Sequence, residues 1–414
     1  MRETTDIAVI GAGVIGLTIA LDLIDQGHEV TLVDPGPPGM GASYGNAGTI
    51  AGYATSPVGT PEVLRSLPSL LFSRTSPLAI RHRALPSLIP WLVRFLWQSL
   101  PAQSGRNAAA LALLLRDAGE LWDDLALRVQ GAGILQRRGC LYLYETGDAF
   151  TRAWADLDRR RALGVEVDLL GPEGLATLEP GLPPQAGAAF FPGATFLDDP
   201  GRMMGLIAAE VLERARHLPA RAERLERRPD GVVIEGGGKD GSLHLHARRV
   251  VIAAGAHSRA LARQAGDRIP LDTERGYHVE WDMAEPLLTR PACPTARGFY
   301  LCPMAGRLRA AGTVELGGLS LPPSPHRIAK LVEGARACFP DLGPPDREWM
   351  GFRPSIPDSL PVIGPSAGGS EVILAFGHGH LGVTMAPVTA RMVAAMIDGH
   401  DPGLAAPACR PDRF

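Results

Sequence analysis

The stretch from Asp6 to Asp34 constrains the fold of this chain more than any other. Residues 7–10 are an apolar run that suits a buried strand, residues 17–24 carry apolar side chains at helical spacing up to Gly27, and residues 30–33 suit a second strand. The sequence Gly-Ala-Gly-Val-Ile-Gly, residues 11–16, joins the first strand to the helix. This order of elements predicts a β-α-β unit that binds a dinucleotide.

The three glycines of this motif have separate tasks. Gly11 permits the tight turn, Gly13 lets backbone amides approach a pyrophosphate, and Gly16 lets the helix pack closely on the strand. The positive end of the helix then faces the phosphates. Asp34 ends the second strand about twenty residues further on, where a carboxylate accepts hydrogen bonds from ribose hydroxyls and disfavours a 2′-phosphate.

Composition excludes several classes of function. A chain of 414 residues predicts two domains or so, and a net charge of −3 gives no basic footprint for nucleic acid. The five cysteines are scattered without CxxC spacing, so neither a disulfide framework nor a metal site is expected. The N-terminus leads directly into a strand rather than a secretory signal, and no uninterrupted apolar run is long enough to span a membrane. A cytoplasmic location is the expectation.

A second glycine-rich turn lies near the C-terminus. The apolar run 372–376 predicts a strand, the sequence Gly-His-Gly-His-Leu-Gly follows at 377–382, and residues 383–397 suit a helix that ends at Gly399. This pattern predicts a second helix N-terminus directed at an anionic group. The buried strand that ends at Ala254 and Gly255 is expected to return to the same parallel sheet.

The segments between these motifs predict a second domain. Residues 107–129 suit one amphipathic helix, 141–144 a strand, and 149–163 a helix. Residues 202–215 suit a further helix, whose N-terminus is expected at Asp198-Asp199-Pro200-Gly201, where a carboxylate can cap the free amides. Residues 232–234 and 243–245 flank a hairpin turn at 239–241, and residues 271–319 have the pattern of an antiparallel sheet.

Residues 57–101 are rich in proline and large apolar side chains, including Leu70 to Phe72 and Leu88 to Trp97. The prolines predict that this run is broken into short helices. Two interpretations stay open, namely core helices of a second domain, or an apolar patch that docks on a membrane or on a quinone-bearing partner.

Taken together, these motifs resemble the D-amino-acid oxidase and dehydrogenase superfamily of flavoproteins, closest in pattern to the small subunits of bacterial D-amino-acid dehydrogenases and to D-hydroxyproline dehydrogenases. The resemblance runs nearly end to end. It rests on the first glycine motif with Asp34, on Ser43 to Gly48, on Val250 to Gly255, on Gly351-Phe352-Arg353-Pro354 with residues 357–364, and on Gly377 to Thr384. The last two segments distinguish the pattern from that of nicotinamide-dependent Rossmann enzymes.

The resemblance implies an α/β fold in which a Rossmann-like FAD-binding domain with a central parallel sheet is interleaved with an α+β substrate domain that has an antiparallel sheet. The FAD-binding domain would comprise residues 1–56, 195–266 and 347–402, the substrate domain residues 57–194 and 267–346, and residues 403–414 a tail. FAD would be held without a covalent bond. The residues implied in its binding are Gly11, Gly13, Val14, Ile15, Gly16, Asp34, Ser43, Asn46, Ala47, Gly48, Ala222, Ala254, Gly255, Gly379, His380, Leu381, Gly382, Val383 and Thr384.

Four residues are candidates for the substrate site on the same basis. Arg353 is implied to pair with a substrate carboxylate, for which a planar guanidinium is suited. Tyr300 matches a tyrosine that bonds the same carboxylate, against the alternative of a core aromatic residue. His278 could line the pocket or belong to the core or rim, and His380 could be catalytic or only contact the flavin.

The implied activity is oxidation of a D-amino acid to the imino acid by hydride transfer to FAD, with D-proline, cis-4-hydroxy-D-proline and linear D-amino acids as candidate substrates. A quinone or a protein partner would then accept the electrons, with peripheral membrane contact. Two alternatives stay open: an oxygen-using oxidase of the glycine or sarcosine type, and a flavin-binding redox subunit without a substrate site of its own.

Overall fold

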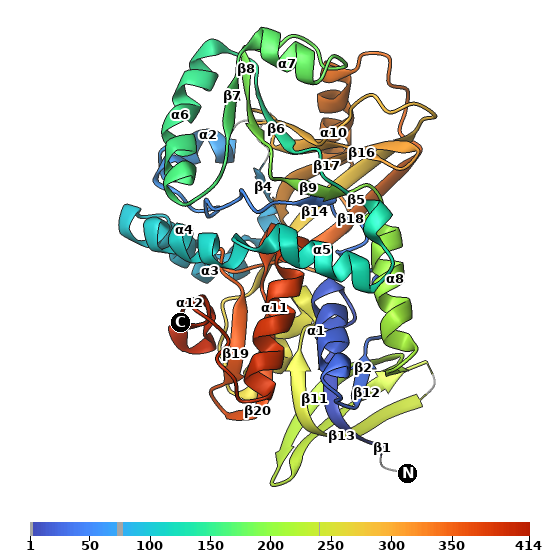
Figure 1. Cartoon of the computed structure of the whole chain (residues 1–414). Helices are drawn as coiled ribbons and strands as arrows, with labels where there is room; N and C mark the ends of the chain where they lie inside the picture. Colours follow the sequence, from blue (N-terminus) through green and yellow to red (C-terminus); the bar gives the residue numbers. More distant parts are fainter. Residues whose placement is uncertain (1–2, 73–77, 240) are drawn as a thin grey trace.

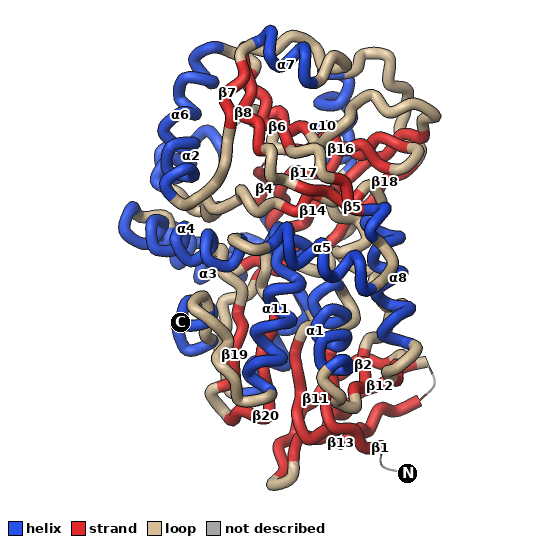
Figure 2. The backbone as a smooth tube through the Cα atoms, in the orientation of Figure 1, coloured by secondary structure: helices blue, strands red, loops and turns tan. Residues whose placement is uncertain are grey.

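The computed structural model describes residues 3–72, 78–239 and 241–414, with the side chains of residues 67–72 left out. These residues form two large sheets, one small sheet and the helices that cover them. The first sheet fills the lower half of the molecule in Figure 1 and the second sheet the upper half, and helices lie beside and between them (Figure 2).

The first sheet has a parallel centre in the order β10-β2-β1-β13-β20. Strands β1 and β2 are those of the predicted β-α-β unit, and β13 pairs parallel with β1, as the apolar run before Gly255 predicted. An antiparallel extension, β11-β12, continues from β13, and the predicted hairpin is that of β12 and β13; its turn residue Asp240 lies outside the described residues. The strands are β1 (Glu3–Ile10), β2 (Val30–Val33), β10 (Arg216–Leu218), β11 (Ala220–Arg228), β12 (Gly231–Gly238), β13 (Gly241–Ile252), β19 (Val362–Ser366) and β20 (Gly369–Phe376).

Helices α1 (Val14–Asp25), α8 (Pro200–Leu212), α9 (Ser258–Ala265) and α11 (Gly382–Ile397) cover this sheet. A carboxylate cap was predicted at Asp198-Asp199, and the structure shows that Asp199 caps α8 by accepting a hydrogen bond from Arg202 N. By length and composition Gly379–Ile397 could cross a membrane, but 67% of it is buried inside the protein, and it packs on α1. This segment is therefore a core helix.

The second sheet is largely antiparallel and has the order β18-β14-β17-β16-β15-β6-β8-β7, with β4 on β17. The predicted antiparallel pattern over 271–319 corresponds to β14 to β17. Strand β18 also belongs here, although it lies in the segment 347–402 expected in the FAD-binding domain; the other domain boundaries stay a prediction. The strands are β4 (Leu78–Ile80), β6 (Cys140–Tyr144), β7 (Asp168–Leu170), β8 (Gly187–Phe191), β14 (Asp272–Asp282), β15 (Ala292–Pro294), β16 (Phe299–Met304), β17 (Arg307–Leu316) and β18 (Arg347–Ser355).

The remaining elements surround these two sheets. The small sheet contains β3 (Thr49–Ile50), β9 (Thr195–Leu197) and β5 (Leu135–Gln136). The other helices are α2 (Pro61–Phe72), α3 (Leu85–Gln98), α4 (Pro101–Leu115), α5 (Ala118–Arg128), α6 (Gly147–Ala162), α7 (Pro172–Leu178), α10 (Pro325–Cys338) and α12 (Ala406–Cys409).

One helix prediction was wrong. The single helix expected over 107–129 is divided into α4 and α5 at Asp117, whose backbone is not helical, and α5 then turns to pack on α11, where Trp122 Nε1 donates to Val383 O at 2.9 Å. The predicted division of residues 57–101 into short helices is confirmed by α2 and α3, although Pro90 lies inside α3. The side chains of Leu70 to Phe72 lie outside the described residues.

Candidate active site

A cavity of about 1530 Å³ lies between the two large sheets. The carboxyl ends of β1, β2, β13 and β20 open into it from one side, and β14, β16, β17 and β18 line it from the other. The structure brings most of the predicted site residues together here. Those that line the cavity are Gly11, Gly13, Val14, Ile15, Asp34, Ser43, Asn46, Ala47, Ala222, Ala254, Gly255, Tyr300, Arg353, Gly379, His380, Leu381, Gly382 and Val383.

The first glycine turn has a geometry that other residues cannot adopt. Gly11 has φ +106°, and a Cβ there would overlap the carbonyl of Ala253. Gly16 does not line the cavity, because it faces the turn itself, and a Cβ at this position would overlap Gly11 O. The turn is fixed further by Ser43, whose Oγ accepts a hydrogen bond from Val14 N at 3.0 Å. First-turn amides of a helix lack intrahelical acceptors, so this end of α1 suits an anion.

Asp34 lies at the end of β2 beside this turn. One carboxylate oxygen accepts from Ala12 N at 2.8 Å and the other accepts from Gly36 N at 2.8 Å. These bonds hold the carboxylate at the cavity wall, where its remaining lone pairs can accept hydrogen bonds from a diol.

The second glycine turn, residues 377–382, follows β20, on the other side of the parallel sheet from Asp34 at the end of β2. Gly255 lies next to it, after the neighbouring strand β13. Gly255 and Gly379 both have φ +55° and open space where a Cβ would lie, so each is required for its backbone conformation. Helix α11 starts directly after this turn and directs its first amides at the cavity. Thr384 lies behind the wall and accepts a hydrogen bond from Ala51 N at 3.0 Å. Gly48, with φ +81°, also packs away from the cavity, against Leu197 O.

Arg353 projects into the cavity from β18. Its Nη1 donates to Thr313 O at 2.9 Å, and a Cβ on Gly276 would overlap the guanidinium, which therefore lies flat against β14. Burial lowers the pKa of Arg353 and the nearby Glu274 opposes this shift, but a guanidinium stays charged. Within the described residues no carboxylate lies within ion-pair distance of it. The cavity thus holds a cation whose other donors are available to a ligand.

Thr313 is strained at the point where it supports Arg353. It is a buried β-branched residue with φ +56°, which is a rare conformation for such a side chain. Strain of this kind costs on the order of 1 to 3 kcal/mol and persists only where the surroundings impose it. Here it directs the Thr313 carbonyl at Arg353. The sequence carries no signal for this role.

Tyrosine hydroxyls form a chain at the same wall. Tyr300 donates to the Tyr142 hydroxyl at 3.1 Å, and Tyr53 lies 3.3 Å from Tyr300 and donates to Cys140 Sγ at 3.2 Å. Burial raises the pKa of Tyr142 to about 12 and that of Tyr300 well above its usual value, so both phenols are neutral donors and acceptors. The sequence analysis named Tyr300 but missed Tyr142, although Tyr142 alternates with the buried Leu141 and Leu143 on β6.

The two histidines of the second turn differ in their surroundings. His378 is buried, its Nε2 lies 2.9 Å from Thr389 Oγ1, and burial lowers its pKa to about 3. The exposed surface of His380 faces the cavity. Desolvation by the surrounding protein and the positive charge of Arg353 lower the pKa of His380. Both imidazoles are therefore neutral at neutral pH.

Comparison with known proteins identifies the group that this cavity accepts. A family model described as FAD-dependent oxidoreductase matches residues 6–396. The chain belongs to this family of FAD-dependent oxidoreductases. It is 33% identical over the full length of both chains to a D-amino-acid oxidase of Bradyrhizobium diazoefficiens, and 31% identical to D-amino acid dehydrogenase 2 of Ralstonia nicotianae, covering 97% of this chain and 98% of that one.

Solved structures of flavoenzymes share the fold. Glycine oxidase from Geobacillus kaustophilus superposes over 100% of both chains with a TM-score of 0.77 at 23% identity. L-Proline dehydrogenase from P. horikoshii superposes with a TM-score of 0.76 at 20% identity, covering 100% of this chain and 98% of that one. These similarities confirm the predicted fold class.

The residues of the cavity fit FAD. Asp34 would accept from the ribose of the adenosine half, the amides of α1 would receive the pyrophosphate, and the amides of α11 would stabilise negative charge on the reduced flavin. The cavity is continuous from the first of these positions to the last. FAD supplies the two-electron acceptor for the reaction.

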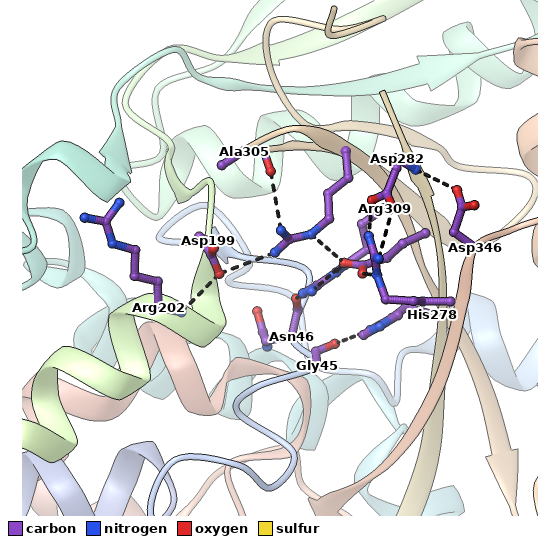
Figure 3. A network of polar contacts seen from close by, with 12 residues as sticks. Gly45, Asn46, Asp199, Arg202, His278, Asp282, Ala305, Arg309 and Asp346 are labelled. Carbon is purple, nitrogen blue, oxygen red and sulfur yellow. Dashed lines mark hydrogen bonds and ion pairs between the residues drawn. The ribbon is translucent and has the colours of Figure 1, made fainter. Parts of the chain in front are cut away.

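His278 is not in the cavity wall but behind it. Its Nδ1 donates to Gly45 O at 3.0 Å, its ring stacks on Trp349, and burial lowers its pKa to about 4. Its neighbour Arg309 donates to Asn46 O (Figure 3). Gly45 and Asn46 line the FAD cavity, and their carbonyls thus accept hydrogen bonds from buried side chains behind the cavity wall.

A buried carboxylate holds Arg309 in turn. Glu280 accepts from Arg309 at 2.7 Å, and also from Arg307 and Arg347, and the arginines lower its pKa to about 2. We call Glu280, Arg309 and His278 the loop clamp. The sequence analysis missed Glu280 and Arg309, because only the register of β14 on β17 places them opposite each other.

Replacing Glu280 with glutamine should weaken FAD binding and lower Tm, because it leaves the buried Arg309 without a counter-charge, at a cost of roughly 3 to 5 kcal/mol. The measurements are thermal unfolding and the Kd of FAD from flavin fluorescence. Glu348→Gln is the matched control, since Glu348 is exposed on neighbouring β18. If Glu280→Gln and the control behaved alike, the loop clamp would have no role in holding the cavity wall.

Acid should destabilise the protein through its neutral histidines. The pKa values of His278 and His378 lie below the unfolded value of about 6.5, so the unfolded chain binds more protons and stability falls as pH decreases below that value. Between about pH 6.5 and about pH 4.5 each should remove roughly 2 kcal/mol from the free energy of unfolding. Glu280 adds a loss in the same direction below about pH 4.5, toward its folded pKa of about 2. Urea unfolding across this range should show a shallower pH dependence for His378→Gln, and an equal slope would refute the assignment.

Proposed function

We propose that this enzyme oxidises a D-amino acid to the corresponding imino acid. The observation that carries the proposal is the guanidinium of Arg353, without a carboxylate partner among the described residues, in the cavity that fits FAD. A bidentate arginine suits a substrate carboxylate. The D configuration is supported by the names of relatives at 31 to 33% identity, which are D-amino-acid oxidases and dehydrogenases.

The residues around Arg353 have distinct roles in this proposal. Arg353 binds the carboxylate, and the hydroxyls of Tyr300 and Tyr142 bond the same group or the amine. FAD bound in this cavity would supply the acceptor for a hydride from the substrate Cα. The amine, which must be neutral at that point, would have lost its proton to solvent, so no dedicated side-chain base is required. His380 is a neutral imidazole at the cavity wall, and the proposed reaction assigns it no proton transfer from Cα.

We propose cyclic amines, D-proline and cis-4-hydroxy-D-proline, as the first substrates to test. The aromatic wall of Tyr142 and Tyr300 offers apolar faces to a ring, and their hydroxyls offer partners to a ring hydroxyl. Linear D-amino acids belong in the same panel. A D-proline turnover no faster than that of D-alanine would contradict the cyclic preference.

A non-oxygen electron acceptor is proposed on the dehydrogenase names of several relatives. The alternative is an oxidase, which the 33% identical D-amino-acid oxidase favours. Turnover of one substrate should be compared with a soluble quinone analogue and with air as the only acceptor. Faster turnover with the quinone supports the dehydrogenase, and equal or faster turnover in air supports the oxidase. No turnover with any amino acid would favour a redox subunit without a substrate site.

A further inference from the structure

Helix α3, which lies next to α4 (Figure 1), has an exposed apolar stripe. Ile89, Val93 and Trp97 follow one another at intervals of four residues and are 53%, 60% and 54% exposed. Leu85 and Leu96 extend the same face and are exposed, as is Leu100 just after the helix. Side chains at this spacing lie on one side of a helix, so the stripe is continuous rather than scattered.

The opposite face holds α3 firmly on the protein. Leu88 and Trp91 are buried, Trp91 stacks on Phe95 at a ring distance of 5.2 Å, and Trp91 Nε1 donates to Ser355 O at 3.2 Å. The exposed stripe therefore belongs to a docked helix. Ser355 lies two residues after Arg353 on β18, so α3 packs on the back of the wall that carries the substrate arginine.

The charged side chains of the segment that carries the stripe have one sign. Residues 63–116 contain seven arginines and neither aspartate nor glutamate. Arg83, Arg94 and Arg106 are exposed, and in the described residues none of them forms an ion pair. Apolar side chains flanked by unpaired arginines, with a tryptophan among them, are the chemistry of a helix that lies in the interface of an anionic bilayer.

We propose that the α3 stripe binds the surface of a membrane that contains anionic phospholipids. Charge complementarity favours an anionic membrane, because the phospholipid headgroups supply negative charges for the exposed arginines of residues 63–116. A second copy of the chain fits less well, since a symmetric contact would place arginines of one α3 region against those of the other. Binding on α3 would place the wall behind Arg353 toward the bilayer, close to membrane-soluble electron acceptors, and it requires no particular substrate.

Sedimentation with vesicles tests the proposal on the FAD-loaded enzyme. Vesicles of phosphatidylcholine alone are compared with vesicles that also contain phosphatidylglycerol, at low and at high salt. A triple variant, Ile89→Ser with Val93→Ser and Trp97→Ser, removes the apolar stripe, and Arg83→Glu with Arg94→Glu removes the charge. Leu127→Ser is the matched control, because Leu127 is an exposed leucine on α5, outside the stripe. Flavin absorbance and Tm show that each variant is folded.

The natural chain and the control should bind anionic vesicles in a salt-sensitive manner. The triple variant should lose at least about tenfold in affinity for both kinds of vesicle, and the charge variant should lose affinity for the anionic ones only. Absence of binding by the natural chain would overturn the proposal, as would unchanged binding by the triple variant. If the natural chain were a dimer and the triple variant a monomer, the stripe would be the contact between two copies of the chain, and the membrane proposal would be overturned.

Discussion

Replacing Arg353 with alanine should lower kcat/KM for the amino-acid substrate by about two to four orders of magnitude while FAD stays bound. The substrate carboxylate would enter a desolvated cavity without its cation, a loss of roughly 3 to 5 kcal/mol. Arg353 donates to Thr313 O within the second sheet, and among the described residues it forms no hydrogen bond to the glycine turns that fit FAD. Steady-state kinetics and flavin absorbance on the same preparation measure both properties.

Arg353→Lys separates the charge of this residue from its shape. Lysine keeps the positive charge but lacks the planar fork that bonds a carboxylate bidentately, so its kcat/KM should lie between those of the natural enzyme and the alanine variant. The loss should appear mainly in KM for the lysine variant. If Arg353→Ala retained full turnover, the carboxylate site would have to lie elsewhere in the cavity.

The second large effect is expected at Gly16. A Cβ at this position would overlap the carbonyl of Gly11, and neither atom can move away, because Gly11 is itself packed against Ala253. Gly16→Ala should therefore separate α1 from β1, abolish FAD binding and leave a colourless protein of lower Tm. Flavin absorbance after purification and a thermal melt give the result.

Gly119→Ala provides the control for this substitution. Gly119 lies in α5 with no atom within 4 Å of a Cβ, so alanine should be tolerated and should even favour the helix slightly. A yellow Gly16→Ala protein with the same Tm as Gly119→Ala would contradict the close packing of the first turn.

The cofactor site was predictable from sequence because its signals are local. The glycine turn at 11–16, Asp34 and the turn at 377–382 are each recognisable within a few residues of sequence, and the structure places Gly11, Gly13, Asp34 and residues 379–382 along one cavity. Arg353, Tyr300 and His380 also meet there. Their roles came from resemblance, and their meeting depends on which strands pair.

The supporting residues were not predictable, because tertiary contacts define them. The residues next to His278 in the sequence indicated that it could line the pocket. In the structure its side chain instead points to Gly45 O, behind the cavity wall. Glu280 meets Arg309 only through strand register, and the strain of Thr313 is a property of a backbone held by two strands. The break of the predicted helix at Asp117 likewise follows from packing on α11 rather than from its own residues.

The most direct measurement is an anaerobic titration of the FAD-loaded enzyme with D- and L-amino acids, including the proline and hydroxyproline isomers, followed through flavin absorbance near 450 nm. We predict that a D-amino acid bleaches this absorbance, that its L-isomer does not, and that Arg353→Ala stays yellow under the same conditions. Bleaching by L-isomers alone would contradict the assigned configuration. No bleaching by any amino acid would contradict the central claim that this cavity binds and oxidises an amino acid.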